Sequence, residues 1–114
     1  DILLEIEKRL KNFPIVLHGA SSISQEAVKK INQYGGKMES AVGIDPKQVS
    51  EASKTSVCKV NIDSDSRVTM TAGIREALSK NPENFDPRGY MGFAREELIK
   101  MYKKKNIEVL GCGK

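Results

Sequence analysis

The 114 residues suffice for one small domain with a single core, and we expect no second domain at this length. The net charge is +4, but the basic residues are scattered apart from the run Lys103–Lys105, which we interpret as a solvated helix face. Because no aromatic residues interleave with the lysines of this run, we expect no nucleic-acid partner. No segment approaches the roughly 20 apolar residues of a membrane span, no signal peptide is visible, and Cys58 and Cys112 lack metal or disulfide spacing, so we expect a cytoplasmic protein without a membrane partner.

The first part of the chain predicts a helix, a strand and a second helix. It begins at Asp1 without a methionine and enters an apolar helical repeat over 1–11, so we interpret it as starting inside a longer protein. The continuous apolar run 14–19 predicts a parallel strand that is buried on both faces. Ser24 is the expected N-cap of the next helix, which should end at 35–36 where two glycines follow one another.

The second part continues the alternation of strands and helices. In chain order we expect a surface loop over 37–44, a short helix opened by Asp45 and Pro46, a buried strand over 56–62, a helix ending before Asn81, a turn over 85–88 and a final helix over 91–102. This order indicates βα units with a parallel sheet, and hence an α/β fold. Two parallel strands are not a stable sheet, so the fold needs strands that this chain does not contain.

A histidine and a small-residue loop stand at the end of the first strand. His18 is the only histidine, and the carboxyl ends of strands are where α/β folds gather ligands, although a lone histidine is more often structural. Gly19, Ala20, Ser21 and Ser22 follow, and their N–H groups with a serine hydroxyl could bind a phosphate. The simpler interpretation of this loop is a tight turn between strand and helix.

Polar residues also follow the second strand. Asn61 and Asp63 could hydrogen-bond substrate hydroxyls, and Ser64 with the next N–H groups could bind a phosphate. For Asp65 or Ser66 we favour a helix-capping role. Two consecutive strand ends of this kind match the phosphate site of strands seven and eight of a (β/α)8 barrel. Spacing leaves open whether Arg67 is a surface residue or reaches an anion.

Two segments together resemble a known family. The sequences Pro14–Ser22 (PIVLHGASS) and Cys58–Asp65 (CKVNIDSD), with Thr71–Arg75 and Phe85–Tyr90, resemble the last two strand-end motifs and the following helices of class II fructose-1,6-bisphosphate aldolases. The resemblance covers nearly the whole chain. It implies that residues 1–114 are the C-terminal part of a single TIM-barrel domain, comprising the last two βα units and the C-terminal helices. The rest of the barrel is absent from this chain.

The resemblance also implies roles for individual residues. The family is a group of zinc-dependent lyases that reversibly cleave fructose 1,6-bisphosphate to dihydroxyacetone phosphate and glyceraldehyde 3-phosphate in glycolysis and gluconeogenesis. His18 resembles one of three zinc ligands, and the zinc acts as a Lewis acid on the C2 carbonyl. The implied substrate contacts are Gly19, Ser21 and Ser64 with the C1 phosphate, Asn61 with the dihydroxyacetone portion, Asp63 with a hydroxyl and Arg67 with the C6 phosphate.

The same resemblance indicates what the chain lacks. The other two zinc ligands and the aspartate that acts as general acid and base belong to earlier strands, so no catalytic residue is expected here and the chain alone should be inactive. The implied partners are the N-terminal piece of the enzyme, a sugar bisphosphate, further copies in a dimer or tetramer, and the monovalent cation, Na⁺ or K⁺, that such enzymes often use. The alternatives are a tagatose-bisphosphate aldolase, disfavoured by Asp63, and a phosphate-binding module without a metal.

Overall fold

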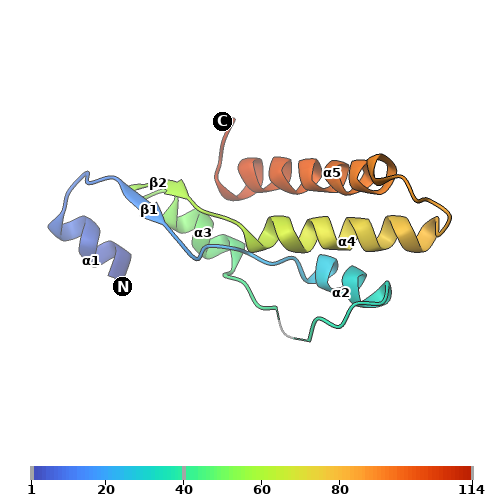
Figure 1. Ribbon diagram of the computed structural model, residues 1–114. Coiled ribbons are helices and arrows are strands. Elements are labelled where there is room, and N and C mark those ends of the chain that lie inside the picture. Colours follow the sequence, from blue (N-terminus) through green and yellow to red (C-terminus); the bar gives the residue numbers. More distant parts are fainter. Residues whose placement is uncertain (1, 40, 114) are drawn as a thin grey trace.

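The computed structural model describes residues 2–39 and 41–113, so Asp1 in the first predicted helix and Ser40 in the predicted loop lie outside it, as does Lys114. Its elements are α1 (Ile2–Arg9), β1 (Ile15–Leu17), α2 (Gln25–Gln33), α3 (Pro46–Ala52), β2 (Val57–Val60), α4 (Ser64–Lys80), α5 (Pro87–Lys104) and a terminal π-helical turn, η1 (Lys105–Val109). The predicted order of helices and strands is confirmed, and η1 is an addition to it. Figure 1 presents this helix-dominated α/β arrangement.

Local capping explains why several helices begin where they do. Ser24 Oγ accepts a hydrogen bond from the Ala27 N–H, and Asp45 Oδ1 accepts one from Lys47, as expected for N-caps. Asp86 likewise accepts from the Arg88 N–H. Because Pro87 follows at the first helical position, α5 begins there and the predicted turn over 85–88 was placed too far along the chain.

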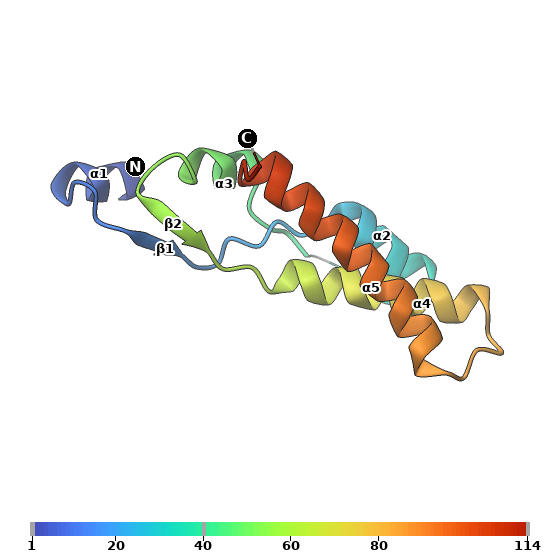
Figure 2. The same ribbon diagram turned by 90° about the horizontal axis from the view of Figure 1, so that it is seen from above.

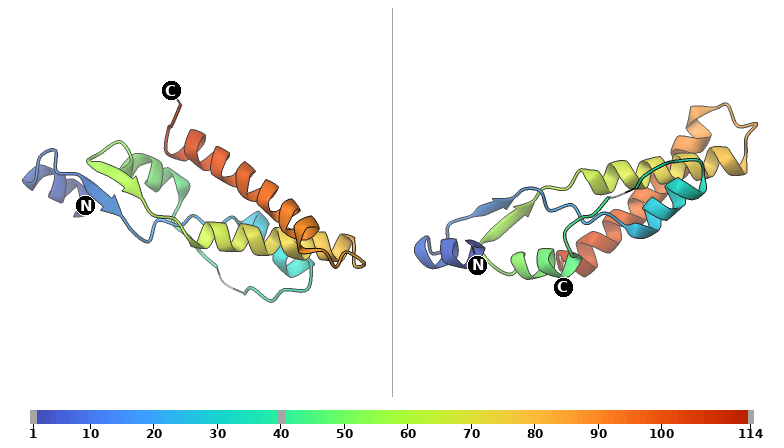
Figure 3. Two further views of the ribbon diagram at one scale, coloured as in Figure 1. Left: turned by 45° about the horizontal axis from the view of Figure 1, so that its top comes forward. Right: turned by 90° about the horizontal axis from the view of Figure 1, so that it is seen from below.

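The two strands pair in parallel, as predicted, with Ile15 opposite Val57 and Leu17 opposite Val60. The prediction that both strands are buried on both faces was wrong for this chain. Val16 is 43% exposed and the middle of β2 is exposed as well, because only part of the sheet surface is covered by helices here. Figure 3 shows the sheet beside α1 at one end of the molecule, with α3 close to the C-terminal end of α5.

The main core lies between α2 and α4. Its buried members are Val28 and Ile31 from α2 and Val68 and Ala72 from α4, and part of the predicted loop, including Met38, packs against them. On another side of α4, α5 comes so close that a Cβ on Gly73 would lie 2.8 Å from the Ala94 Cα. Figures 1 and 2 show α4 and α5 side by side, with α2 also against α4.

The molecule is elongated. Its principal extents are 58 × 30 × 18 Å and its radius of gyration is 17.0 Å, whereas a compact domain of this length has about 13 Å. None of the described helices is long and apolar enough to cross a bilayer.

Candidate functional site

The carboxyl ends of β1 and β2 bring two of the predicted site residues together. The Asn61 N–H donates to the Leu17 carbonyl at 2.9 Å, which extends the strand pairing by one residue. This register sets the Asn61 side chain beside His18, with Nδ2 3.1 Å from the imidazole Nδ1. The same amide nitrogen lies 3.5 Å from Nε2, so it faces both ring nitrogens. The ring itself is exposed to solvent.

The loop after β1 is held to the turn after β2 by a second polar contact. The Asp63 N–H donates to Ser21 Oγ at 3.3 Å, which leaves the hydroxyl proton of Ser21 available for another acceptor. Gly19 has φ +65°, a left-handed conformation that residues with a Cβ adopt at a cost, and a Cβ there would touch nothing within 4 Å. Backbone conformation, and not crowding, therefore favours glycine at this position.

The side chains of Asp63 and Arg67 form an exposed ion pair. Arg67 Nε lies 2.9 Å from Asp63 Oδ1, one helical turn away, and this hydrogen bond raises the pKa of Arg67, so the guanidinium stays cationic. Both side chains are more than two-thirds exposed, and such pairs contribute little stability. The pair can therefore separate when another partner for the guanidinium arrives.

Asp65 and Ser66 do not cap α4, so that prediction was wrong. Asp63 is the residue at the N-cap position, although its side chain makes no capping hydrogen bond. Ser66 Oγ lies 2.5 Å from the Tyr102 hydroxyl of α5. The Asp65 carboxylate is buried instead, and it accepts hydrogen bonds from the Ser22 N–H at 3.1 and 3.2 Å to its two oxygens.

The lysine run also differs from its prediction as a solvated helix face. Lys103 and Lys104 are exposed, but Lys105 is buried and its ammonium contacts Asp65 Oδ1. The sequence does carry a signal for this. Lys105 follows Leu98 and Met101 at positions i+7 and i+4 of the same apolar stripe, so its stem lies on the packed side of the helix.

A metal site is incomplete among the described residues. No group of three or more His, Cys, Asp or Glu side chains is close enough there to hold an ion. His18 offers one accessible imidazole, whereas catalytic zinc normally has three protein ligands. The part of the chain that the structure describes therefore offers zinc one ligand, His18, and not a complete site.

The geometry thus consists of two adjacent strand ends that carry an imidazole, an amide, a small-residue loop and an exposed Asp–Arg pair. Over residues 1–114 the sequence matches the family model of class-II fructose-bisphosphate aldolase. The chain belongs to this family. The aldolase family is one of lyases, and the resemblance drawn from the strand-end motifs is confirmed.

Individual aldolases agree with the family match. The chain is 57% identical over 113 residues to fructose-bisphosphate aldolase of Treponema pallidum. The matched region covers 99% of this chain and 34% of that protein. It is 42% identical over 118 residues to the aldolase of Giardia intestinalis (99% and 36%), and 44% identical over 98 residues to that of Thermus caldophilus (86% and 32%). The chain spans about a third of the length of these curated relatives.

Proposed function

We propose that the chain is the C-terminal part of the (β/α)8 barrel of a class II fructose-bisphosphate aldolase, which reversibly cleaves fructose 1,6-bisphosphate to dihydroxyacetone phosphate and glyceraldehyde 3-phosphate. The observation that carries the proposal is the contact of His18 with Asn61 at 3.1 Å, at neighbouring carboxyl ends of parallel strands. Barrel enzymes hold their active sites at this edge. The exposed faces of both strands are the surfaces that the other barrel elements would cover.

His18 is proposed as one of three zinc ligands, with the other two on the remainder of the enzyme. When bound, zinc would polarise the C2 carbonyl of the substrate. The Asn61 amide, whose nitrogen lies 3.1 Å from Nδ1 and 3.5 Å from Nε2, would help to hold the imidazole in place for the metal. The same amide would contact the dihydroxyacetone portion of the substrate.

The C1 phosphate is proposed to lie between the loop after β1 and the start of α4. Ser64 opens α4 and would offer its N–H group, since the first N–H groups of a helix have no partner within it. Gly19 would offer a loop N–H group from the other side. Ser21 adds its free hydroxyl proton. Asp63 would bind a substrate hydroxyl, and Arg67 would leave Asp63 to bind the C6 phosphate, a change that both exposed side chains permit.

The test is a chimera in which this chain replaces the matching third of the Treponema pallidum relative. We expect it to bind about one zinc per subunit and to cleave fructose 1,6-bisphosphate in preference to tagatose 1,6-bisphosphate. The unaltered relative is the control. A folded chimera without zinc or cleavage would favour a phosphate-binding module, and equal or reversed preference between the two sugars would refute the role of Asp63.

A further inference from the structure

We propose that Asp65 and Lys105 are positioning residues of the anion site, because together they fix the loop 19–22 and cancel the negative charge beneath it. This inference rests on the proposed function, in which that loop binds the C1 phosphate. Neither residue was expected in the site from the sequence, and neither is proposed to touch the substrate.

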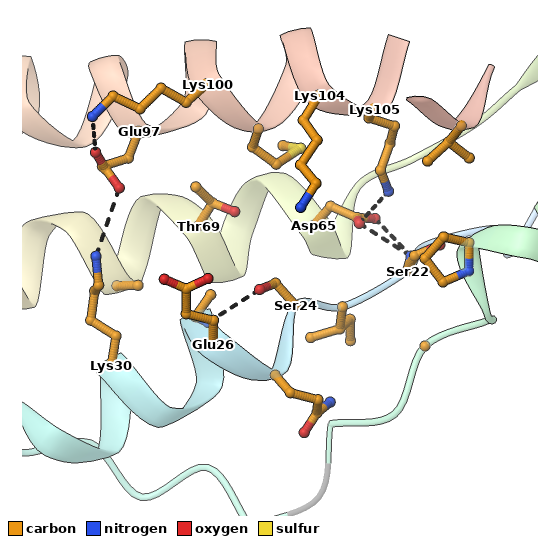
Figure 4. Close-up of a pocket in the computed structure, with 18 of the residues that line it drawn as sticks. Ser22, Ser24, Glu26, Lys30, Asp65, Thr69, Glu97, Lys100, Lys104 and Lys105 are labelled. Carbon is orange, nitrogen blue, oxygen red and sulfur yellow. Dashed lines mark hydrogen bonds and ion pairs between the residues drawn. The ribbon is translucent and has the colours of Figure 1, made fainter. Parts of the chain in front are cut away.

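The pair is buried beneath the loop. Asp65 is 4% exposed and Lys105 is 8% exposed, and their charged atoms are in direct contact. Both oxygens of the same carboxylate lie within hydrogen-bonding distance of the Ser22 N–H. Figure 4 shows the Lys105 side chain, at the start of η1, reaching down to Asp65, with the Ser22 backbone on the other side of the carboxylate.

The opposite side of the loop is enclosed by backbone. The Ile44 N–H donates to the Ser21 carbonyl at 2.9 Å, and a Cβ on Gly43 would lie 2.5 Å from that same oxygen. The Ser21–Ser22 segment is thus held between residues 43–44 and the Asp65 carboxylate. A loop fixed in this way binds an anion without first losing conformational entropy.

Lys105 is needed because a carboxylate alone would oppose anion binding. An ionised Asp65 directly beneath the loop would repel a phosphate, and the repulsion would be large because little water screens a buried charge. The Lys105 ammonium neutralises it while leaving the hydrogen bonds to Ser22 in place. Since Lys105 opens the η1 turn, the C-terminal end of α5 becomes part of the support of the anion site.

The first experiment compares Lys105→Met with Lys104→Met in the chimera. Lys104 precedes Lys105 directly, is exposed, and makes no ion pair among the described residues, so it is the matched control. For Lys105→Met we expect KM for fructose 1,6-bisphosphate and the inhibition constant of inorganic phosphate to rise by on the order of ten-fold. The kcat and the zinc content should stay close to those of Lys104→Met.

A second variant separates charge from packing. Asp65→Asn with Lys105→Met removes both charges, while the amide oxygen still accepts from the Ser22 N–H. We expect the double variant to regain most of the lost phosphate affinity. A folded double variant that binds phosphate as weakly as Lys105→Met overturns the electrostatic argument. If Lys105→Met alone does not fold, the double variant is compared with the unaltered chimera instead, and phosphate binding that is much weaker in the double variant overturns the argument.

Failure of the inference is distinct from failure of the proposed function. If the chimera without further substitutions does not cleave fructose 1,6-bisphosphate, the proposed function fails. If it cleaves, but Lys105→Met has the same KM and phosphate inhibition as Lys104→Met, only the positioning role fails. A loss of kcat and zinc at unchanged KM would also overturn it, because such a change would reveal a general structural role.

Discussion

At the position of His18, the backbone decides what the side chain can do. The strand ends with Leu17, whose carbonyl accepts from the Asn61 N–H, so the next residue on each strand leaves the sheet at the same edge. The Asn61 amide then fixes the orientation of the imidazole. A histidine placed by a strand register and a hydrogen-bonded neighbour is oriented before a metal binds, which suits a ligand.

Replacing this histidine should remove zinc. In the chimera, His18→Ala leaves two protein ligands out of the expected three, so we expect zinc per subunit to fall well below one and cleavage to be lost. Metal content of the dialysed protein measures this directly. Cys58→Ser, which removes an exposed thiol from the same sheet, should keep its zinc. Full zinc in His18→Ala would refute the ligand assignment.

Between elements, the crossing of α4 and α5 depends on a glycine at the contact, Gly73. Gly73 faces Ala94 so closely that any Cβ would push the helices apart. Ala94 is fully buried at the same contact. Here a glycine in the middle of a long helix, which usually weakens it, allows the two backbones to approach.

Gly73→Ala should therefore destabilise the protein although alanine favours helix. We expect a loss of about 1–3 kcal/mol from overpacking, seen as a lower midpoint of thermal unfolding of the chimera. The matched substitution Gly92→Ala lies in α5, where a Cβ would meet nothing within 4 Å, and should be neutral or raise stability by up to about 1 kcal/mol. Equal effects of the two substitutions would show that the contact with Ala94 is not limiting.

Helices α2, α4 and α5 share a charged cluster around Glu76 of α4. Lys30 of α2 lies 2.7 Å from its Oε2, as an ion pair whose angles fall short of a good hydrogen bond, and Lys80 lies 2.6 Å from Oε1. Lys30 also lies 3.7 Å from Glu97 of α5. The contact with Lys30, followed by that with Lys80, lowers the pKa of the buried Glu76 carboxyl below its usual 4.5.

This lowered pKa predicts a dependence of stability on pH. Because the folded state binds the proton more weakly, the contribution of Glu76 is complete above about pH 4.5 and is lost as the pH falls below that value. Glu76→Gln should cost about 2 kcal/mol at neutral pH, and it should make the unfolding midpoint depend less on pH in the acid range. Glu96→Gln, on the exposed face of α5, should leave the pH dependence of the unfolding midpoint unchanged. An unchanged pH dependence for Glu76→Gln would contradict this account.

Across the whole molecule, the helices form a packed layer but the sheet does not. The core between α2 and α4 is small, and the two strands at the other end leave Val16 and Cys58 exposed. A radius of gyration of 17.0 Å reflects this open shape. Under the proposed function, the rest of the barrel would bury this uncovered surface.

The isolated chain should accordingly be weakly stable and inactive. With so little apolar surface buried, we expect a free energy of unfolding below the roughly 5 kcal/mol typical of small domains, and a broad transition by circular dichroism. No cleavage of fructose 1,6-bisphosphate and no stoichiometric zinc are expected without the rest of the enzyme. A sharp transition with bound zinc in the chain alone would contradict both expectations.

The sequence by itself determined the order of the elements and the residues at the two strand ends. Caps such as Ser24 and Asp45, the apolar runs before His18 and Asn61, and the glycines that end helices act over a few residues, so a linear pattern contains them. The same local motifs carried the family resemblance. The two strand ends could be assigned to one site in advance because parallel strands bring their carboxyl ends to one edge.

Only the tertiary structure decided which side of each strand is covered and which carboxylate pairs with the buried Lys105. Asp65 and Lys105 are separated by 40 positions, and each alone fits a local role, as a helix cap or as part of a solvated face. Their contact depends on how α5 crosses α4, which in turn depends on Gly73. Charge pairing across such a distance is set by helix packing, and no pattern within a short stretch of sequence contains it.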